Sequence, residues 1–379
     1  MEADLSGRID RRRFLRIAGV AGLSLAGVAC GAPAANPAPS PAATTPPKST
    51  AATELTASPK AATAEEAQAK LVEAAKKEGR LSIYDSAVIE DLENRAKAFK
   101  KAYPFMEFDL YRGDSGDLTE KAITEAKAGR NQVDVIRASA GGMVPLVDRG
   151  LTMKYKSPSA IDMPKDSYDP EGAWYYPEHM LHVIAYNTKL ISPAEAPKSY
   201  EDLADPRFQG KLAIEAECTE WFTQMKSIMG EAKFLDLARR IAANKPRPIK
   251  GHGTLARLVV TGETPVAVMI YQHRAQMDKE SKAPVDWVFG SKPVTTSPVM
   301  LLLMKDAPHP NAAKLYLDWC LSKQGQEEDV VKVMNRFPLR SGVDLPGHLK
   351  GVQVFNPPLE NVRLVNEVAP QFRQVFDIQ

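Results

Sequence analysis

Short β-strand patterns alternate with helix patterns along most of this chain. Between residues 80 and 139, three strand-like segments have the sequences LSIYDS, MEFDLYRG and VDVIRAS, and each precedes a helical pattern. The alternation resumes after residue 180 with LHVIAYNTKL, KLAIEAE, RPIKG, PVAVMIY and VDWVFG. Repeated β-α-β steps of this length predict an α/β fold with mainly parallel sheets, whose connecting loops gather along one edge.

The alternation comes in two series, which indicates two lobes. Long apolar strand patterns near residues 182–190 and 293–304 would join them as a double crossover hinge. A chain of 379 residues is long enough for two such cores. The cleft between the lobes is therefore the expected ligand site.

Helix boundaries are also predicted from the sequence. The segment that starts TEWFTQMKSIMG predicts a helix continuing to Arg240. Asp117-Leu118-Thr119-Glu120 has the pattern of a capping box that opens a helix ending near Gly129. The segment Glu178–His182 continues into a strand pattern, which would place His179 and His182 on opposite faces and makes a shared metal site unfavourable.

The first 29 residues have the pattern of an export signal. Asp10–Arg16, with the sequence DRRRFLR, precedes an apolar stretch of 13 residues from Ile17 to Ala29. That stretch is shorter than the ~20 residues of a membrane-spanning helix and is typical of a signal peptide. Paired arginines followed by Phe-Leu resemble the twin-arginine signal, which exports folded proteins.

Cys30 follows the apolar stretch in the sequence AGVACG, which resembles a bacterial lipobox. Of residues 31–60, 24 are Ala, Pro, Thr or Ser, so residues 30–63 would form a tether that cannot bury a core. We expect a lipid on Cys30 to anchor the chain outside the cytoplasm, in a periplasm or on the outer face of the cytoplasmic membrane. The alternative is a plain signal cut near Ala29, with Cys30 unmodified.

Beyond residue 29 the charges are balanced, with 44 basic and 44 acidic side chains. This balance argues against a nucleic-acid-binding protein. The chain has no HExxH, GxSxG, GxxxxGK[ST] or CxxC motif, so we expect no enzyme. A secreted metallohydrolase built on His252, His273 and Asp85 is the alternative. Cys218 and Cys320 lack metal-like spacing, and either a disulfide or two small buried side chains would explain them.

Five segments resemble, in the same order, the extracytoplasmic solute-binding proteins of ABC importers, of the ferric-iron-binding type. They are EAAKKEGRLSIYDS (73–86), RGDSGDLTEKAITEAKAGR (112–130), YNTKLISPAEAPKSYEDLADPRFQGKLAI (186–214), GHGTLARLVVTGETPVAV (251–268) and APHPNAAKLYLDWCLSKQGQ (307–326).

The resemblance implies the type II periplasmic-binding-protein fold. Lobe one would comprise residues 64–184 plus 292–379, and lobe two residues 185–291. Such a protein is expected to be a monomer that captures its solute without catalysis and delivers it to an ABC permease and ATPase. A sensory lipoprotein with the same fold is the alternative.

The resemblance leaves two ligand classes open, of which the first is ferric iron as cargo. In ferric members a tandem tyrosine follows the strand that here has the sequence PVAVMIY. Tyr271 occupies the first position, but Gln272 stands in the second and removes an anionic ligand that this hard cation favours. Tyr84, Tyr271 and His273, with Asp85 and an added anion, would complete a set. Alternatively, Tyr84 and Tyr271 line an apolar wall. No cofactor is expected.

The second ligand class is a small organic oxyanion. Loops that end strands and open helices offer backbone N–H groups and a favourable helix dipole. An aromatic side chain would stack on an organic body. The candidate residues are Ser86, Ser115, Gly116, Ser139, Ala140, Thr219, His252 and, for stacking, Tyr186 and Trp221. Ordinary helix caps and turns use the same residue types.

Overall fold

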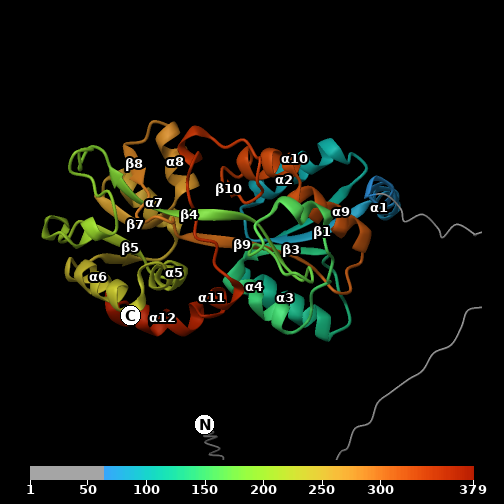
Figure 1. Cartoon of the computed structure of the whole chain (residues 1–379), viewed down its shortest axis with the longest axis horizontal. Coiled ribbons are helices and arrows are strands. Elements are labelled where there is room, and N and C mark those ends of the chain that lie inside the picture. Colours follow the sequence, from blue (N-terminus) through green and yellow to red (C-terminus); the bar gives the residue numbers. More distant parts are fainter. Residues whose placement is uncertain (1–63) are drawn as a thin grey trace, which may run out of the picture. The chain divides into compact units, whose positions relative to one another are not determined.

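The computed structural model describes residues 64–379, which form two α/β lobes joined by long strands (Figure 1). The predicted signal peptide, the lipidation site Cys30 and the tether lie outside the described residues. Among the described residues, no helix combines the length and apolar character that crossing a membrane requires. The two-lobed α/β fold with a double crossover is confirmed.

The strands form one continuous hydrogen-bonded path in the order β2-β1-β3-β9-β4-β7-β5-β6, with β8 and β10 attached to β4. Within each lobe the pairings β1–β2, β1–β3, β5–β6 and β5–β7 are parallel, whereas β9 and β4 run antiparallel to their neighbours. The strands are β1 (Arg80–Asp85), β2 (Glu107–Arg112), β3 (Val135–Ser139), β4 (Tyr175–Asn187), β5 (Leu212–Glu215), β6 (Arg247–Ile249), β7 (Val266–Tyr271), β8 (Val285–Val288), β9 (Thr296–Leu303) and β10 (Phe337–Pro338).

Helices cover both faces of this sheet. In the view of Figure 1, α2, α8 and α10 lie above it, and α3, α4, α5, α6, α11 and α12 lie below. The helices are α1 (Ala64–Glu78), α2 (Ile89–Ala102), α3 (Ser115–Lys127), α4 (Ala140–Asp148), α5 (Thr219–Met229), α6 (Glu231–Ala243), α7 (His252–Thr261), α8 (Gln272–Glu280), α9 (Pro310–Leu321), α10 (Lys323–Gly325), α11 (Leu359–Arg363) and α12 (Val365–Phe376).

Two helix boundaries differ from the prediction. The expected capping box at Asp117 is wrong, because α3 already begins at Ser115 with Asp114 as its N-cap. The helix expected to continue to Arg240 is divided into α5 and α6 at Gly230, whose φ of +83° is left-handed. Glycine adopts that conformation without the steric cost that a side chain would add.

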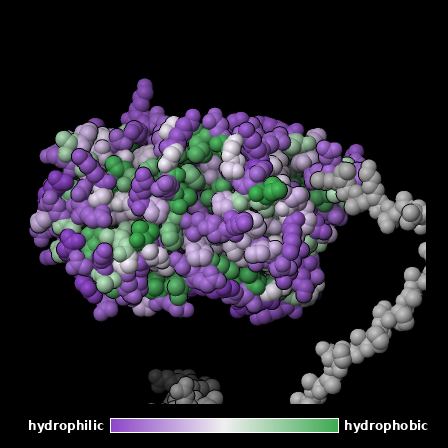
Figure 2. Space-filling view, in the orientation of Figure 1, coloured by the Kyte–Doolittle hydropathy of each residue, from purple (hydrophilic) through white to green (hydrophobic). Residues whose placement is uncertain are grey.

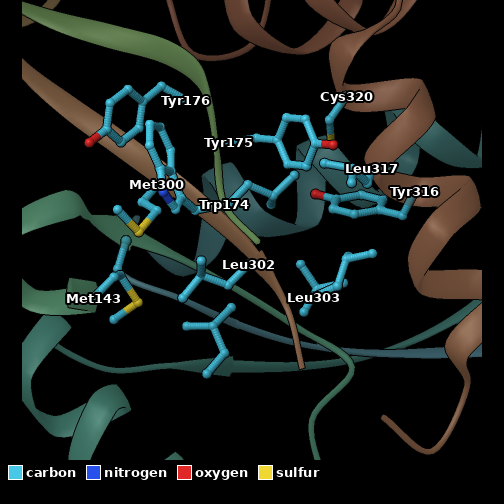
Figure 3. Close-up of a cluster of buried hydrophobic side chains, with 14 of the residues drawn as sticks. Met143, Trp174, Tyr175, Tyr176, Met300, Leu302, Leu303, Tyr316, Leu317 and Cys320 are labelled. Atoms are coloured by element: carbon cyan, nitrogen blue, oxygen red, sulfur yellow. The ribbon is translucent and has the colours of Figure 1, made fainter. Parts of the chain in front are cut away.

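The core of the first lobe packs both faces of its strands (Figure 3). Tyr175 points toward Tyr316 and Cys320 of α9, while Tyr176 points the other way, beside Trp174 and toward Met300. This alternation follows the period of two along β4. Both faces are apolar because helices cover both sides of the sheet.

The core of the second lobe includes the C-terminal helix. Phe372 and Phe376 of α12 are buried in the same cluster as Trp221 and Phe222 of α5. Phe372 lies edge-on to Phe222, with ring centroids 5.6 Å apart. Residues 365–376 therefore pack with the core of residues 184–269, although they follow lobe-one segments in the sequence.

The lobes are joined where β4 changes partners. Its first half pairs with β9 as far as Leu181, and its second half pairs with β7 from His182 onward. The chain returns to the first lobe through residues 289–295, which lead into β9. Polar residues cover most of the face shown in Figure 2, with smaller apolar areas between them.

Candidate ligand-binding cleft

Three helices, two from the first lobe and one from the second, begin at one cavity. This cavity has a volume of about 420 Å³, and we call it the cleft cavity. Helix α3 follows β2, α4 follows β3 and α5 follows β5, so each helix starts at the carboxyl end of a parallel strand. Residues from the first turns of these helices line the cavity, among them Gly116, Ser139, Gly141, Thr219 and Glu220.

The first turns of these helices carry no side-chain caps. Asp114 and Ser139 occupy the N-cap positions of α3 and α4, and neither side chain accepts a hydrogen bond from its helix. Cys218 is the N-cap of α5, where the Thr219 N–H donates to the Glu217 carbonyl at 2.8 Å. The first N–H groups of a helix have no partner within it, and the helix dipole adds partial positive charge there. The cleft cavity is therefore suited to oxygen atoms that carry negative charge.

Glycines keep the backbone accessible at this point. A Cβ atom on Gly116 or Gly141 would meet no heavy atom within 4 Å, so both positions open on free space. Gly142 has a different role, because a Cβ there would lie 2.6 Å from the Cβ of Ser115. Its missing side chain lets α3 and α4 approach, and Thr119 Oγ1 donates a hydrogen bond of 2.7 Å to the Gly142 carbonyl.

Three carboxyl groups also line the cleft cavity. Glu217 forms an ion pair of 2.8 Å with Lys250, which offsets its charge. Burial, with a smaller contribution from the charge of Glu215, raises the pKa of Glu220 to about 7. Glu120 is exposed to solvent. Because Glu217 is paired and Glu220 is partly protonated near neutral pH, the lining repels an anion less than its composition suggests.

A stack of aromatic rings lies beside the first turn of α5. Tyr271, at the end of β7, lies with its ring centroid 3.8 Å from that of His252, 5.6 Å from His273 and 5.9 Å from His182, all within 28° of parallel. Burial raises the pKa of the Tyr271 hydroxyl, and the charges of Glu220 and Cys218 raise it further. The phenol is thus held protonated.

The histidines of this stack are held neutral. Burial lowers the pKa of His252, and it lowers that of His182 well below the usual range. His252 Nδ1 lies 2.7 Å from the carbonyl oxygen of Met269. Burial, together with the charge of Arg336, lowers the pKa of His273 to about 3, and its Nδ1 has no hydrogen-bond partner.

His182 ties the stack to the hinge. Its ring nitrogens lie 3.2 Å from Thr295 Oγ1 and 2.9 Å from Ser297 Oγ, and Cys218 Sγ lies 3.5 Å from Nε2. His179 faces the other side of β4 and contacts Asn356 with its Nε2 at 2.7 Å. The expectation that the two histidines face opposite sides of a strand is therefore confirmed.

A buried ion network lies at the carboxyl ends of β1 and β3. Arg95 is paired with Asp85 and, at 2.9 Å, with Asp329. Arg137 forms ion pairs with Asp329 at 2.9 Å and with Glu178 at 2.6 Å. Burial alone would raise the pKa of Glu178, but the charges of the neighbouring arginines lower it to about 2. The network fixes the strand ends that lead into the cleft.

Arg336 extends this network toward the second lobe. Its Nη1 donates a hydrogen bond of 2.7 Å to Glu178, and its charge contributes to lowering the pKa of His273 on α8. The Nε atom of Arg336 is buried without a hydrogen-bond partner. Positive charge from the first lobe thus faces the neutral ring stack of the second.

The structure places the predicted oxyanion residues as follows. Gly116, Ser139 and Thr219 line the cleft cavity, and Ser115 Oγ accepts a hydrogen bond of 3.3 Å from the Ser139 N–H. Ala140 is the fully buried first residue of α4. The Ser86 N–H donates to the Arg137 carbonyl at 3.1 Å, and Asp85 is committed to Arg95.

The two residues predicted to stack on an organic ligand lie elsewhere. Trp221 is fully buried and packs edge-on against Tyr200 and Phe234, with centroids 5.2 and 5.3 Å away. Tyr186 is buried in the same core. Thr219 and Glu220 face the cavity, whereas the next position along α5 turns toward the core.

The predicted ferric set is divided between two places. The Tyr84 hydroxyl donates to Glu125 at 2.8 Å, and burial followed by this contact raises the pKa of Tyr84 to about 12. Tyr271 and His273 lie together in the ring stack, with the fully buried Gln272 between them in the chain. Among residues 64–379, no three His, Cys, Asp or Glu side chains are grouped so as to hold a metal ion.

Cys218 and Cys320 are free thiols, and they are buried in the cores of different lobes. Burial raises the pKa of each, so neither is an activated nucleophile. Ser297 and Arg336 were not predicted as parts of the cleft, because they reach it only through the tertiary fold.

Comparison with known proteins supports the fold and decides the family. Residues 133–358 match the model of a family described as bacterial extracellular solute-binding protein. The chain belongs to this family. Among curated proteins, this solute-binding protein is 26% identical over 262 residues to an uncharacterised protein of Haemophilus influenzae, covering 66% of this chain and 75% of the relative. It is 22% identical over 245 residues to the Fe(3+)-binding periplasmic protein of Serratia marcescens, covering 62% and 71%.

Solved structures share its fold. Iron-bound HitA of Pseudomonas aeruginosa superposes with a TM-score of 0.66 at 19% identity, covering 78% of this chain and 99% of HitA. AfuA of Actinobacillus pleuropneumoniae, with fructose-6-phosphate bound, gives 0.65 at 22% identity, covering 79% and 99%. At these identities the likeness shows the fold alone. Members of the family are binding proteins, so the coarse expectation of solute binding is confirmed.

Proposed function

We propose that this protein is a solute-binding lipoprotein of an ABC importer that captures a small organic anion between its lobes and delivers it to a permease. One observation carries the proposal. Uncapped first turns of α3 and α4 from one lobe, and of α5 from the other, open on the same cleft cavity. An oxyanion bound there would receive hydrogen bonds from the first turns of α3 and α4 and from the Thr219 hydroxyl of α5, because the Thr219 N–H already donates to the Glu217 carbonyl.

Such a ligand would also favour a closing movement of the two lobes. A molecule that bridges the lobes gains contacts in the closed state that the open state lacks, and this shifts the population toward the closed state. The hinge at Leu181 and His182 and the return through residues 289–295 supply the two crossings that such a movement needs. The lipid on Cys30 would keep the receptor near the membrane, with the permease and its ATPase as partners.

Ferric iron with an accompanying anion is the second candidate, favoured by the similarity to the Serratia Fe(3+)-binding protein and to iron-bound HitA. The side chains support it less well. Tyr84 would have to leave Glu125, and Tyr271 would have to lose a proton in a site that raises its pKa. AfuA, whose structure holds fructose-6-phosphate, shows that this fold also accommodates an organic anion.

The proposal is tested by filling the cleft cavity. Gly116 lies in α3, where an added Cβ atom meets no heavy atom within 4 Å, so we expect the side chain of Gly116→Leu to project into the cavity that Gly116 lines. Native mass spectrometry of the freshly purified protein should show a co-purified small anion. We expect Gly116→Leu to lose it, with an affinity at least about tenfold weaker by calorimetry.

Gly347→Leu is the matched control, because Gly347 has equal free space outside this cavity. It should keep the bound molecule. Equal affinity in the Gly116→Leu variant and the wild type would place the ligand elsewhere and contradict the proposal. A permease gene adjacent to that of this protein would distinguish an importer component from a sensory lipoprotein.

A further inference from the structure

A second cavity, of about 540 Å³, lies at the opposite end of α5, and we call it the hinge cavity. Its lining comes from the last turn of α5, from residues 289–294 that connect the second lobe to β9, and from residues 350–353 of the first lobe. Val294 joins these segments, because its N–H donates to the Gln353 carbonyl at 2.8 Å. The hinge cavity shares no lining residue with the cleft cavity.

The floor of the hinge cavity is apolar. Met225, Ile228 and Met229 of α5 contribute thioether and branched aliphatic groups, and Phe289 and Val352 face them from the hinge connection and the first lobe. Phe289 packs against the cores of both lobes. Methionine adapts its shape to an apolar body, and aromatic contact with its sulfur is favourable.

Lysine side chains surround this floor. Lys198, Lys292 and Lys350 line the hinge cavity against a single carboxylate, Glu201. Of the ion pairs within residues 64–379, none involves Lys198 or Lys292, and Lys350 meets only the exposed Asp344 at 3.7 Å. The rim therefore carries a net positive charge, which comes mainly from Lys198 and Lys292.

We propose that the hinge cavity is a second ligand site, which binds a small amphipathic anion. The occupant would have an aromatic or branched apolar body, which the floor removes from water, and a carboxylate, sulfonate or phosphate group that meets the lysines. Lys198 and Lys292 supply the charge, and Met225 and Met229 contact the body. Helix α5 reaches both sites, since its 11 residues span about 16 Å from the cleft cavity to the hinge cavity.

The test uses 8-anilinonaphthalene-1-sulfonate, which combines an aromatic body with a sulfonate. In a fluorescence titration of the full-length protein, Lys198→Ala/Lys292→Ala should weaken binding at least about tenfold at low salt. The control is Lys165→Ala/Lys305→Ala, which removes the same charge from exposed positions outside the hinge cavity and should leave the affinity within about twofold. The uncharged N-phenyl-1-naphthylamine should bind both double variants equally.

The position of the probe is measured separately by NMR of ¹³C-methyl methionine. The sulfonate probe should shift the methyl signals of Met225 and Met229 while leaving those of Met143 and Met300, in the first-lobe core, unchanged. Equal weakening by the two lysine pairs would overturn the proposal. So would shifts that leave Met225 and Met229 unaffected, since the probe would then occupy the cleft or another surface.

Discussion

Tyr271 and His252 lie face to face, with ring centroids 3.8 Å apart and planes inclined by 28°. Tyr271 ends β7 and His252 begins α7, so the stack fixes two loops of the second lobe that open toward the cleft. The Tyr271 hydroxyl lies 3.5 Å from Ser297 on β9. The same ring therefore contacts its own lobe and the strand that returns to the other lobe.

Replacing Tyr271 should separate these two contacts. Tyr271→Ala removes the stack, and we expect the affinity for the co-purified solute to fall at least about tenfold, or about 1.4 kcal/mol, by calorimetry. Tyr271→Phe keeps the ring and loses only the hydroxyl contact, so it should bind within about threefold of the wild type. An unchanged affinity in Tyr271→Ala would remove this residue from the site.

The ferric candidate makes an opposite spectroscopic prediction. If the ligand is an organic anion, adding ferric citrate should produce no visible phenolate-to-iron charge-transfer band, because Tyr84 is bonded to Glu125 and Gln272 supplies no anionic ligand beside Tyr271. The absorption spectrum of the purified protein with and without ferric citrate measures this. A band that is lost in Tyr271→Phe would establish iron as the cargo instead.

Glu220 should make anion binding depend on pH. Its pKa of about 7 means that the carboxyl group is ionised at pH 8 and mostly protonated at pH 6. Removing a negative charge beside the cavity favours an anion, so the affinity should rise as the pH falls from 8 to 6. Calorimetry at both pH values, with a ligand that does not itself titrate in this range, measures it.

Glu220→Gln is the control for this dependence. The amide has no charge to lose, so the variant should bind at pH 8 about as tightly as the wild type binds at pH 6. If the affinity of Glu220→Gln still depends steeply on pH, another group titrates, and the role given to Glu220 is wrong.

The buried ion network should be costly to break. Asp329 accepts hydrogen bonds from Arg95 and Arg137, and all three side chains are almost fully buried. Asp329→Asn removes one of the two carboxylate partners of each buried guanidinium, leaving Arg95 with Asp85 and Arg137 with Glu178, and should lower the free energy of unfolding by about 3–5 kcal/mol. Asp109→Asn, in an exposed pair with Arg80, should cost less than about 1 kcal/mol. Urea denaturation measures the free energy of unfolding of both variants. Equal losses would contradict a stabilising role for the buried ion network.

Helix α12 should stabilise the second lobe. Phe372→Ala removes a fully buried ring from contact with Phe222, which should lower the free energy of unfolding by about 3–5 kcal/mol. Leu364→Ala, just before the helix and 40% exposed, should change it by less than about 0.5 kcal/mol. A negligible cost for Phe372→Ala in urea would show that α12 is dispensable to this core.

Local patterns predicted much of this architecture. The apolar runs that became β4 and β9 identified the hinge, because a strand buried on both faces is apolar throughout. The strand-to-helix junctions placed Gly116, Ser139 and Thr219 at the cleft, since the carboxyl ends of parallel strands meet at one edge.

The contacts between residues far apart in the chain could not be predicted from local sequence patterns. Arg95 and Asp329 are 234 residues apart, and nothing local indicates that both charges are buried together. Trp221 was expected to stack on a ligand, but it points into the core of the second lobe. Its direction depends on where α5 starts and on which residues pack against that helix. The hydrogen bond from Tyr84 to Glu125 likewise depends on the tertiary fold, because it forms only when α3 packs against β1.

The most direct test of the whole account is small-angle X-ray scattering of the purified protein with and without the anion identified by mass spectrometry. If the anion binds between the lobes and draws them together, the radius of gyration should fall on saturation, and Gly116→Leu should show no such change. A scattering curve that stays the same when calorimetry shows the wild-type site to be full would contradict capture by lobe closure.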